Sequence, residues 1–253
     1  MRDEIGHELR TLEAKKGVRV LYALESGSRC WGFASADSDY DVRFVYVRSK
    51  NDYLRLEAVR DTIEWRLDDE LDIVGWDVAK FLRLMRGSNP GAFEWLGSTI
   101  VYREEPCFAA VREAAAACFD PVAHTHHYLG MATKHSVRYI KSGRPTLKRY
   151  LYVVRALLAA RWAVEERTPV PMAFDDLCEA KLELDLVPVV EDLVVRKRQD
   201  LEGDMHEPIP ALDRWMDEVP AEIAQQLQQL SPSRRVAWEV LDAVFLGLLD
   251  EVE

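Results

Sequence analysis

The sequence lacks the features that mark membrane, secreted and metal–thiolate proteins. No run of about eighteen apolar residues occurs in the 253-residue chain, so no membrane-spanning helix is expected. The first residues, Met1 to Glu4, lack the apolar segment of a signal peptide. The four cysteines are scattered and form no Cys-x-x-Cys pair, which is typical of free thiols in a reducing compartment. We therefore expect a cytoplasmic protein with no membrane partner.

Positive charge is also scarce. The chain has 33 Lys and Arg residues against 44 Asp and Glu, a formal net charge of −11. This balance disfavours broad, nonspecific nucleic-acid binding, which depends on neutralising phosphates. Two interpretations of the basic residues remain, a local basic groove and a solvated helix face. The candidates for such a groove lie within one stretch and are Lys134, Arg138, Lys141, Arg144, Lys148, Arg149, Arg155 and Arg161.

The order of the sequence periodicities indicates an α+β protein, with a small α/β half before a helical half. Apolar spacing predicts a helix over residues 1–16. A second helix should begin near Asp77, a plausible N-cap, and end at Ser88-Asn89-Pro90. Between these helices, strands are predicted over residues 18–25, 39–47, 59–65 and 71–76. The pattern from about residue 106 onward is helical, so we expect domains at residues 1–105 and 106–253.

A Gly-Ser turn follows the first predicted strand and precedes a short helix. Gly27 permits close approach of the backbone, and Ser28 adds a hydroxyl donor. Free N–H groups and the positive end of a helix dipole favour phosphate at such a place. A lone Gly-Ser pair usually marks only a turn. Its position before an acidic strand makes the pattern more specific.

Two carboxylates begin the strand that follows. Asp39 and Asp41 are two residues apart, so their side chains should point to the same face of the strand. Like charges this close need a proton or a cation to offset their repulsion. Mg²⁺ prefers carboxylate oxygens together with substrate phosphates. Arg43 falls on the same face, and a simple ion pair between Arg43 and Asp41 is the alternative interpretation.

The stretches from Glu25 to Phe33 and from Asp37 to Phe44 resemble the nucleotidyltransferases of the DNA polymerase β superfamily. The similarity is greatest to the predicted family named for its association with an RNA ligase. It extends over most of the chain, through the stretches Asp72–Asp77, Ser88–Pro90, Lys148–Arg155, Ala160–Trp162 and Pro171–Leu177. The resemblance implies a nucleotidyltransferase domain with a mixed sheet, followed by a helical domain.

The resemblance also implies a third carboxylate on a neighbouring strand. Asp72 is the first candidate, because its neighbours Leu71 and Ile73 are apolar strand residues. Asp77 is the alternative, although its position before an amphipathic stripe suits a helix cap.

By resemblance, the reaction is nucleotidyl transfer with two metal ions. Asp39, Asp41 and Asp72 would be both the catalytic residues and the ligands of Mg²⁺ or Mn²⁺. Gly27, Ser28 and Arg29 would bind the phosphates of a nucleoside triphosphate such as ATP. An acceptor hydroxyl would attack the α-phosphorus, and pyrophosphate would leave.

The helical half should contribute further nucleotide-binding residues. Lys148, Tyr152 and Arg155 have spacings of four and three residues and can share one helix face. This face would supply phosphate donors and a ring for stacking on a base. The alternative is that Tyr152 belongs to the core and the two cations pair with surface acids.

The sequence does not identify the acceptor of the nucleotide. The family name suggests an RNA end and a role in RNA repair, whereas the acidic charge mildly favours a small molecule or a protein side chain. A nucleotide-binding regulatory pseudoenzyme is the third possibility. A monomer and a small homo-oligomer are equally compatible with the sequence.

Overall fold

The computed structural model describes residues 1–35, 38–68, 70–143, 145–199 and 206–251. It divides into two compact units, each assembled from separate segments of the chain. The first unit contains Met1–Cys30, Asp39–Phe119 and Arg234–Glu253. The second contains Trp31–Ser38 and Asp120–Ser233.

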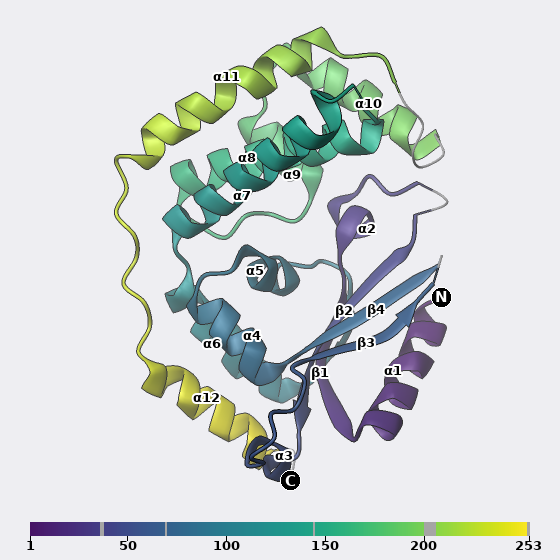
Figure 1. Ribbon diagram of the computed structural model, residues 1–253, viewed down its shortest axis with the longest axis vertical. Coiled ribbons are helices and arrows are strands. Elements are labelled where there is room, and N and C mark those ends of the chain that lie inside the picture. The colour runs from purple at the N-terminus through teal and green to yellow at the C-terminus, as the bar shows by residue number, and fades with distance from the viewer. Residues whose placement is uncertain (36–37, 69, 144, 200–205, 252–253) are drawn as a thin grey trace. The chain divides into compact units, whose positions relative to one another are not determined.

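The first unit is built on a mixed sheet, with strand order β3-β4-β2-β1-β5 (Figure 1). Strands β2 and β4 are parallel, and the other neighbouring pairs are antiparallel. This arrangement confirms the mixed-sheet α/β domain that the sequence predicted. The strands are β1 (Val18–Glu25), β2 (Tyr40–Arg48), β3 (Thr62–Leu67), β4 (Leu71–Asp77) and β5 (Val101–Glu104).

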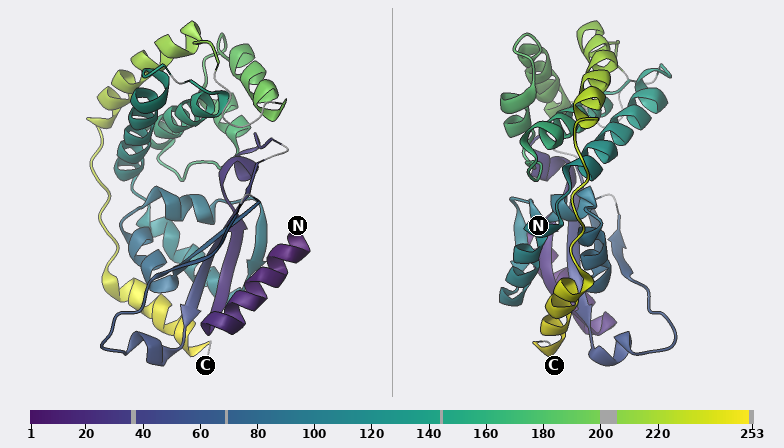
Figure 2. Two further views of the ribbon diagram at one scale, coloured as in Figure 1. Left: turned by 45° about the vertical axis from the view of Figure 1, so that its right-hand side comes forward. Right: turned by 90° about the vertical axis from the view of Figure 1, so that its left-hand side faces the viewer.

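One face of the sheet is covered by the N-terminal helix α1 (Arg2–Lys16), as the left view of Figure 2 shows. Its predicted apolar stripe of Ile5, Leu9 and Leu12 is buried against strand residues that include Phe44 and Ile73. Removing these side chains from water stabilises the helix on the sheet far more than helix propensity does.

Several helices cover the other face. Strand residues such as Val45 and Val47 are buried with the predicted stripe of α4, which comprises Val78, Phe81, Leu82 and Met85. The helices of this layer are α4 (Val78–Arg86), α5 (Pro90–Leu96), α6 (Ala109–Cys118) and α12 (Trp238–Asp250). Two short helices connect strands, α2 (Gly27–Trp31) and α3 (Lys50–Tyr53), and the 3₁₀ turn η1 (Pro106–Phe108) leads from β5 into α6.

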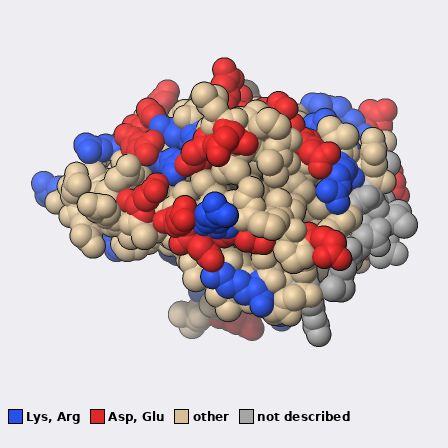
Figure 3. All heavy atoms as spheres, turned by 90° about the horizontal axis from the view of Figure 1, so that it is seen from above, with Lys and Arg blue, Asp and Glu red and all other residues tan. Residues whose placement is uncertain are grey.

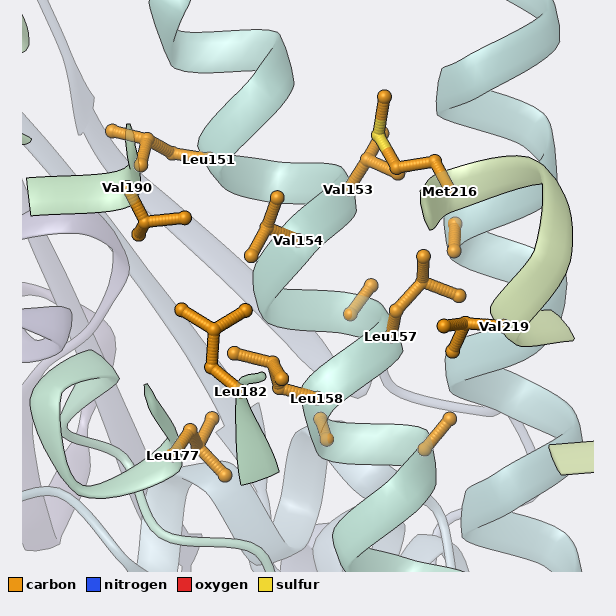
Figure 4. Close-up of a cluster of buried hydrophobic side chains, with 14 of the residues drawn as sticks. Leu151, Val153, Val154, Leu157, Leu158, Leu177, Leu182, Val190, Met216 and Val219 are labelled. Carbon is orange, nitrogen blue, oxygen red and sulfur yellow. The ribbon is translucent and has the colours of Figure 1, made fainter. Parts of the chain in front are cut away.

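The second unit is mostly helical and also includes the short Trp31–Ser38 segment. Its central helix, α8 (Leu147–Glu166), is buried along most of its length, and the core around it is drawn in Figure 4. Phe33 from the short segment joins the same core. The remaining helices are α7 (Pro121–His135), the π-helical turn η2 (Ser136–Ile140), α9 (Phe174–Lys181), α10 (Val187–Gln199) and α11 (Pro210–Leu227).

The units differ from the sequence-based division at residue 105. Helix α6 lies in the first unit, because Val111, Ala115 and Cys118 are buried beside the sheet. The C-terminal helix α12 also returns to the first unit through Leu241 and Leu248. Helical periodicity shows that a face is buried, but it does not show which core buries it.

Individual elements follow the sequence closely, with three differences. Strand β2 begins at Tyr40, one residue after Asp39, and β3 begins at Thr62, three residues after its predicted start. Strand β5 was not predicted, because its four residues are too few to show a period. No helix within the described ranges is long and apolar enough to cross a membrane.

Asp77 caps helix α4, as predicted. Its side chain accepts a hydrogen bond from the Ala79 amide at 2.8 Å and another from the Tyr53 hydroxyl at 3.0 Å. Burial raises the pKa of its carboxyl above the usual value. The residue is therefore committed to local structure at the end of β4.

Replacing Asp77 with Ala should lower the free energy of unfolding by about 1–2 kcal/mol, because it removes the cap and the acceptor of the Tyr53 hydroxyl proton. Chemical denaturation of the two proteins measures the difference. Asp77→Asn keeps a capping oxygen and should lose much less. Equal losses in both variants would show that the cap is not what Asp77 contributes.

Candidate active site

Two of the predicted carboxylates come together in the first unit. Parallel pairing places Asp41 of β2 opposite Asp72 of β4 in the strand register. One nitrogen of the Arg43 guanidinium, Nη2, lies 2.8 Å from Asp41 Oδ1 and 2.7 Å from Asp72 Oδ2. All three side chains are partly buried, with 18–24% of their surface exposed. A single cation therefore bridges the two acids.

Arg43 also bonds to the strand backbone. Its Nη1 donates to the Asp72 carbonyl at 2.9 Å and to the Val42 carbonyl at 3.1 Å. The guanidinium is thus fixed between β2 and β4. The predicted alternative of an Arg43–Asp41 ion pair is present, and it extends to Asp72 as well. Its presence does not exclude a site for divalent metal, because each carboxylate has a second oxygen.

Gly27 lies directly against this carboxylate pair. It has a positive φ of 62°, and a Cβ built on it would stand 2.0 Å from Asp41 Oδ2. No side chain other than hydrogen fits there. The amide of Ser26 donates to the Asp41 carbonyl at 2.8 Å, so the Gly-Ser turn and the acidic strand are joined. Ser28 is buried next to the turn.

Glu25 is a site residue that the sequence analysis did not select. It is buried, and its Oε1 accepts a hydrogen bond from the Asp41 amide at 2.8 Å while its Oε2 accepts one from the Tyr102 hydroxyl. Burial raises the pKa of Glu25, and the charge of Asp41 adds to the increase. An acid that ends an apolar strand directly before a Gly-Ser turn was the available sequence signal.

The side chain of Arg29 contacts the backbone of Asp39. The Nε of Arg29 donates to the Asp39 carbonyl at 3.0 Å, and the Arg29 guanidinium lies 3.7 Å from the centre of the Tyr40 ring. Within the described residues, no three His, Cys, Asp or Glu side chains converge as a set that could hold a metal. The three-carboxylate site with Asp39 therefore stays a prediction.

The donors of the Asp41–Asp72 pair fit a hard divalent cation. Asp72 Oδ1 is buried and has no hydrogen-bond partner among the described residues. Asp41 Oδ2 lies in the space that Gly27 leaves open. Carboxylate oxygens of this kind are the protein ligands that Mg²⁺ and Mn²⁺ prefer.

The predicted nucleotide-binding residues of α8 belong to the second unit. The Tyr152 ring meets Trp31 edge-on at 5.1 Å, and Lys148 Nζ lies 6.0 Å from the centre of the Tyr152 ring. Arg155 is buried, with its guanidinium 4.3 Å from the Trp31 ring and 3.8 Å from Met172 Sδ. The Trp31–Ser38 segment that they contact connects the Gly-Ser turn to Asp39 in the sequence. Their nucleotide-binding role stays a prediction.

Comparison with known proteins agrees with this geometry. A family model described as "RNA repair pathway DNA polymerase beta family" matches residues 1–247. The chain belongs to this family. The resemblance inferred from the Gly-Ser turn and the acidic strand is thereby confirmed.

Two individual proteins are similar to this member of the RNA repair pathway DNA polymerase beta family. Uncharacterized protein YcgL from Bacillus subtilis (strain 168) is 38% identical over all of this chain and 98% of its own length. The crystal structure of a nucleotidyltransferase-like protein from Exiguobacterium sibiricum matches 88% of this chain and 74% of its own, at 13% identity and a TM-score of 0.30. That structural similarity is weak, and the fold described above rests on this chain's own strands and helices.

Replacing Arg43 with Met should destabilise the protein in EDTA by about 1–3 kcal/mol, because Asp41 and Asp72 lose the cation that offsets their repulsion. Mn²⁺ should restore part of the loss in the variant and change the wild type less. Denaturant unfolding in EDTA and in Mn²⁺ measures both effects.

Arg103→Met is the matched control, since Arg103 pairs with a single carboxylate, Glu13, at 2.8 Å in the same unit. Its stability should not respond to Mn²⁺. A loss in Arg43→Met that is the same with and without Mn²⁺ would show that the acid pair does not attract the metal.

Proposed function

We propose that the protein is a Mg²⁺-dependent nucleotidyltransferase, which moves a nucleoside monophosphate from a nucleoside triphosphate to an acceptor hydroxyl and releases pyrophosphate. The observation that supports this most strongly is the Asp41–Arg43–Asp72 bridge beside Gly27. Membership of the polymerase β family agrees with it. A binding protein without turnover has no need for two acids held together at a cost in electrostatic energy.

Asp41 and Asp72 would hold the metal through the carboxylate oxygens that Arg43 does not use, and Asp39 would complete the set. A bound divalent cation supplies charge neutralisation at the attacking and leaving oxygens and orients the triphosphate. Mn²⁺ has the same ligand preference and is expected to substitute.

The chain's own residues account for the remaining chemistry. In the reaction, the acceptor oxygen bonds to the α-phosphorus while the bond from that phosphorus to the bridging oxygen breaks. The Asp72 carboxylate would accept the proton of the acceptor hydroxyl. Arg43 keeps Asp72 in position for this step. Catalysis would come mostly from positioning and from preorganised charge.

Phosphate binding is assigned to the Gly-Ser turn. Gly27 allows close approach of the backbone, and Ser28 and Arg29 would donate hydrogen bonds to the outer phosphates. The sequence-based prediction that Lys148, Tyr152 and Arg155 bind the nucleotide is part of this proposal. The acceptor would be an RNA end if the family description holds for this chain, whereas a small molecule or a protein side chain would suit its acidic surface.

Asp72→Asn should abolish transfer of an α-³²P-labelled nucleotide, whereas Asp77→Asn should leave the transfer rate within about twofold of wild type. The reason is that Asp72 faces the Arg43 bridge, while Asp77 caps α4. The assay offers each labelled triphosphate with Mg²⁺ or Mn²⁺, together with cellular RNA, protein and small-molecule fractions. The fraction that becomes labelled identifies the acceptor class.

Asp41→Asn, with its fold checked by circular dichroism, provides the second inactive variant. Loss of transfer in Asp77→Asn but not in Asp72→Asn would exchange the roles of the two acids. Nucleotide binding without transfer to any fraction by the wild type would contradict the proposed function and favour a regulatory role.

A further inference from the structure

A group of aromatic and cationic side chains lies where α7, η2 and α8 of the second unit meet. The ring of Tyr139, on η2, is flanked by two arginines. The Arg149 guanidinium carbon lies 3.8 Å from the centre of the ring, and that of Arg138 lies 5.3 Å from it. Guanidinium groups this close to a phenol ring form a positively charged aromatic platform.

His135 extends this platform. Its ring lies 5.6 Å from that of Tyr139 and is nearly parallel to that of Tyr152, with centres 6.0 Å apart and planes at 12°. Its Nδ1 is buried and has no hydrogen-bond partner within the described part of the chain. The pKa of His135 is lowered by burial and then by the charges of Arg149, Lys134 and Arg138. Three cations therefore converge on one imidazole.

Among the residues that the structure describes, no acid pairs with the cations of this group. Lys134, Arg138 and Arg149 have no carboxylate within 4 Å among the residues that the structure describes. Elsewhere in the same basic stretch, Lys141 pairs with Asp217 at 2.6 Å, and Arg161 bridges Glu183 and Glu222. Arg144 lies outside the described residues. Unbalanced positive charge is unusual in a chain of net charge −11.

Figure 3 shows one face of the molecule, on which blue and red side chains are interspersed. A protein with such a surface can attract a polyanion only where cations stand close together and unpaired. The group on α7, η2 and α8 meets this condition and adds rings to it.

We propose that His135, Arg138, Tyr139 and Arg149 form a binding surface for single-stranded nucleic acid. The guanidinium groups would bind phosphates, and the rings and the Arg149 plane would stack on bases, which is how single strands are bound without sequence preference. A strand bound here would be the acceptor that carries the reacting hydroxyl, and this last step rests on the proposed function.

Fluorescence anisotropy with short labelled single-stranded RNA and DNA oligonucleotides tests the proposal. The double variant Arg138→Ser/Arg149→Ser should weaken binding about tenfold or more and lower the slope of log K against log salt by about 1.4, for two lost phosphate contacts. Tyr139→Leu should weaken binding with little change in that slope. The RNA and DNA arms show which strand is preferred.

Lys141→Ser is the matched control, because it removes a paired cation of the same stretch. It should bind like the wild type. Thermal unfolding of every variant separates loss of binding from loss of fold. Three results would each overturn the proposal in favour of nonspecific polyanion attraction. The first is that Lys141→Ser weakens binding as much as the double variant, and the second is that Tyr139→Leu has no effect. The third is that heparin displaces the strand as well as unlabelled oligonucleotide does.

The outcomes for this surface and for the proposed function can be told apart. Strand binding that depends on these residues, without any nucleotidyl transfer, supports the proposed binding surface and contradicts the proposed transferase function. Transfer to a small molecule by a protein that binds no strand supports the transferase and overturns the surface. Displacement of the strand by a free nucleoside triphosphate at equal affinity would also overturn it, since that would make the surface a mononucleotide site.

Discussion

The candidate site depends on one electrostatic constraint, the bridge from Arg43 to both Asp41 and Asp72. Two carboxylates on neighbouring parallel strands repel each other and would be costly in a buried position without a cation. Because Nη2 of Arg43 serves both acids at 2.7–2.8 Å, β2 and β4 can be neighbours with their acids in register. The guanidinium uses one oxygen of each acid, and the second oxygen of Asp72 has no hydrogen-bond partner among the described residues.

The rest of the first unit fixes the same acids from other directions. Glu25 holds the Asp41 amide, and Gly27 leaves the space that Asp41 Oδ2 needs. Helices on both faces of the sheet bury the strand residues that lie between. The site is thus preorganised by buried apolar packing and by backbone hydrogen bonds, which is the condition under which electrostatic catalysis is effective.

The sequence predicts the parts of this structure that depend on local chemistry. The N-terminal helix, β1, β4 and the Asp77 cap follow from periodicity and capping, and the Gly-Ser turn before an acidic strand indicates the family. The rest depends on contacts between distant residues. The parallel pairing that puts Asp72 opposite Asp41, the sharing of Arg43 by both acids, and the return of α12 to the sheet leave no periodic signal in the chain.

The most direct test of the account is a crystal structure of the protein with Mn²⁺ and a nonhydrolysable nucleoside triphosphate analogue, with data collected at the manganese absorption edge. The account predicts an anomalous peak bound by carboxylate oxygens of Asp41 and Asp72, with triphosphate oxygens completing its coordination beside Gly27. A nucleotide bound elsewhere, or a metal that contacts neither acid, would contradict the central claim that the Arg43-bridged acids form the catalytic site.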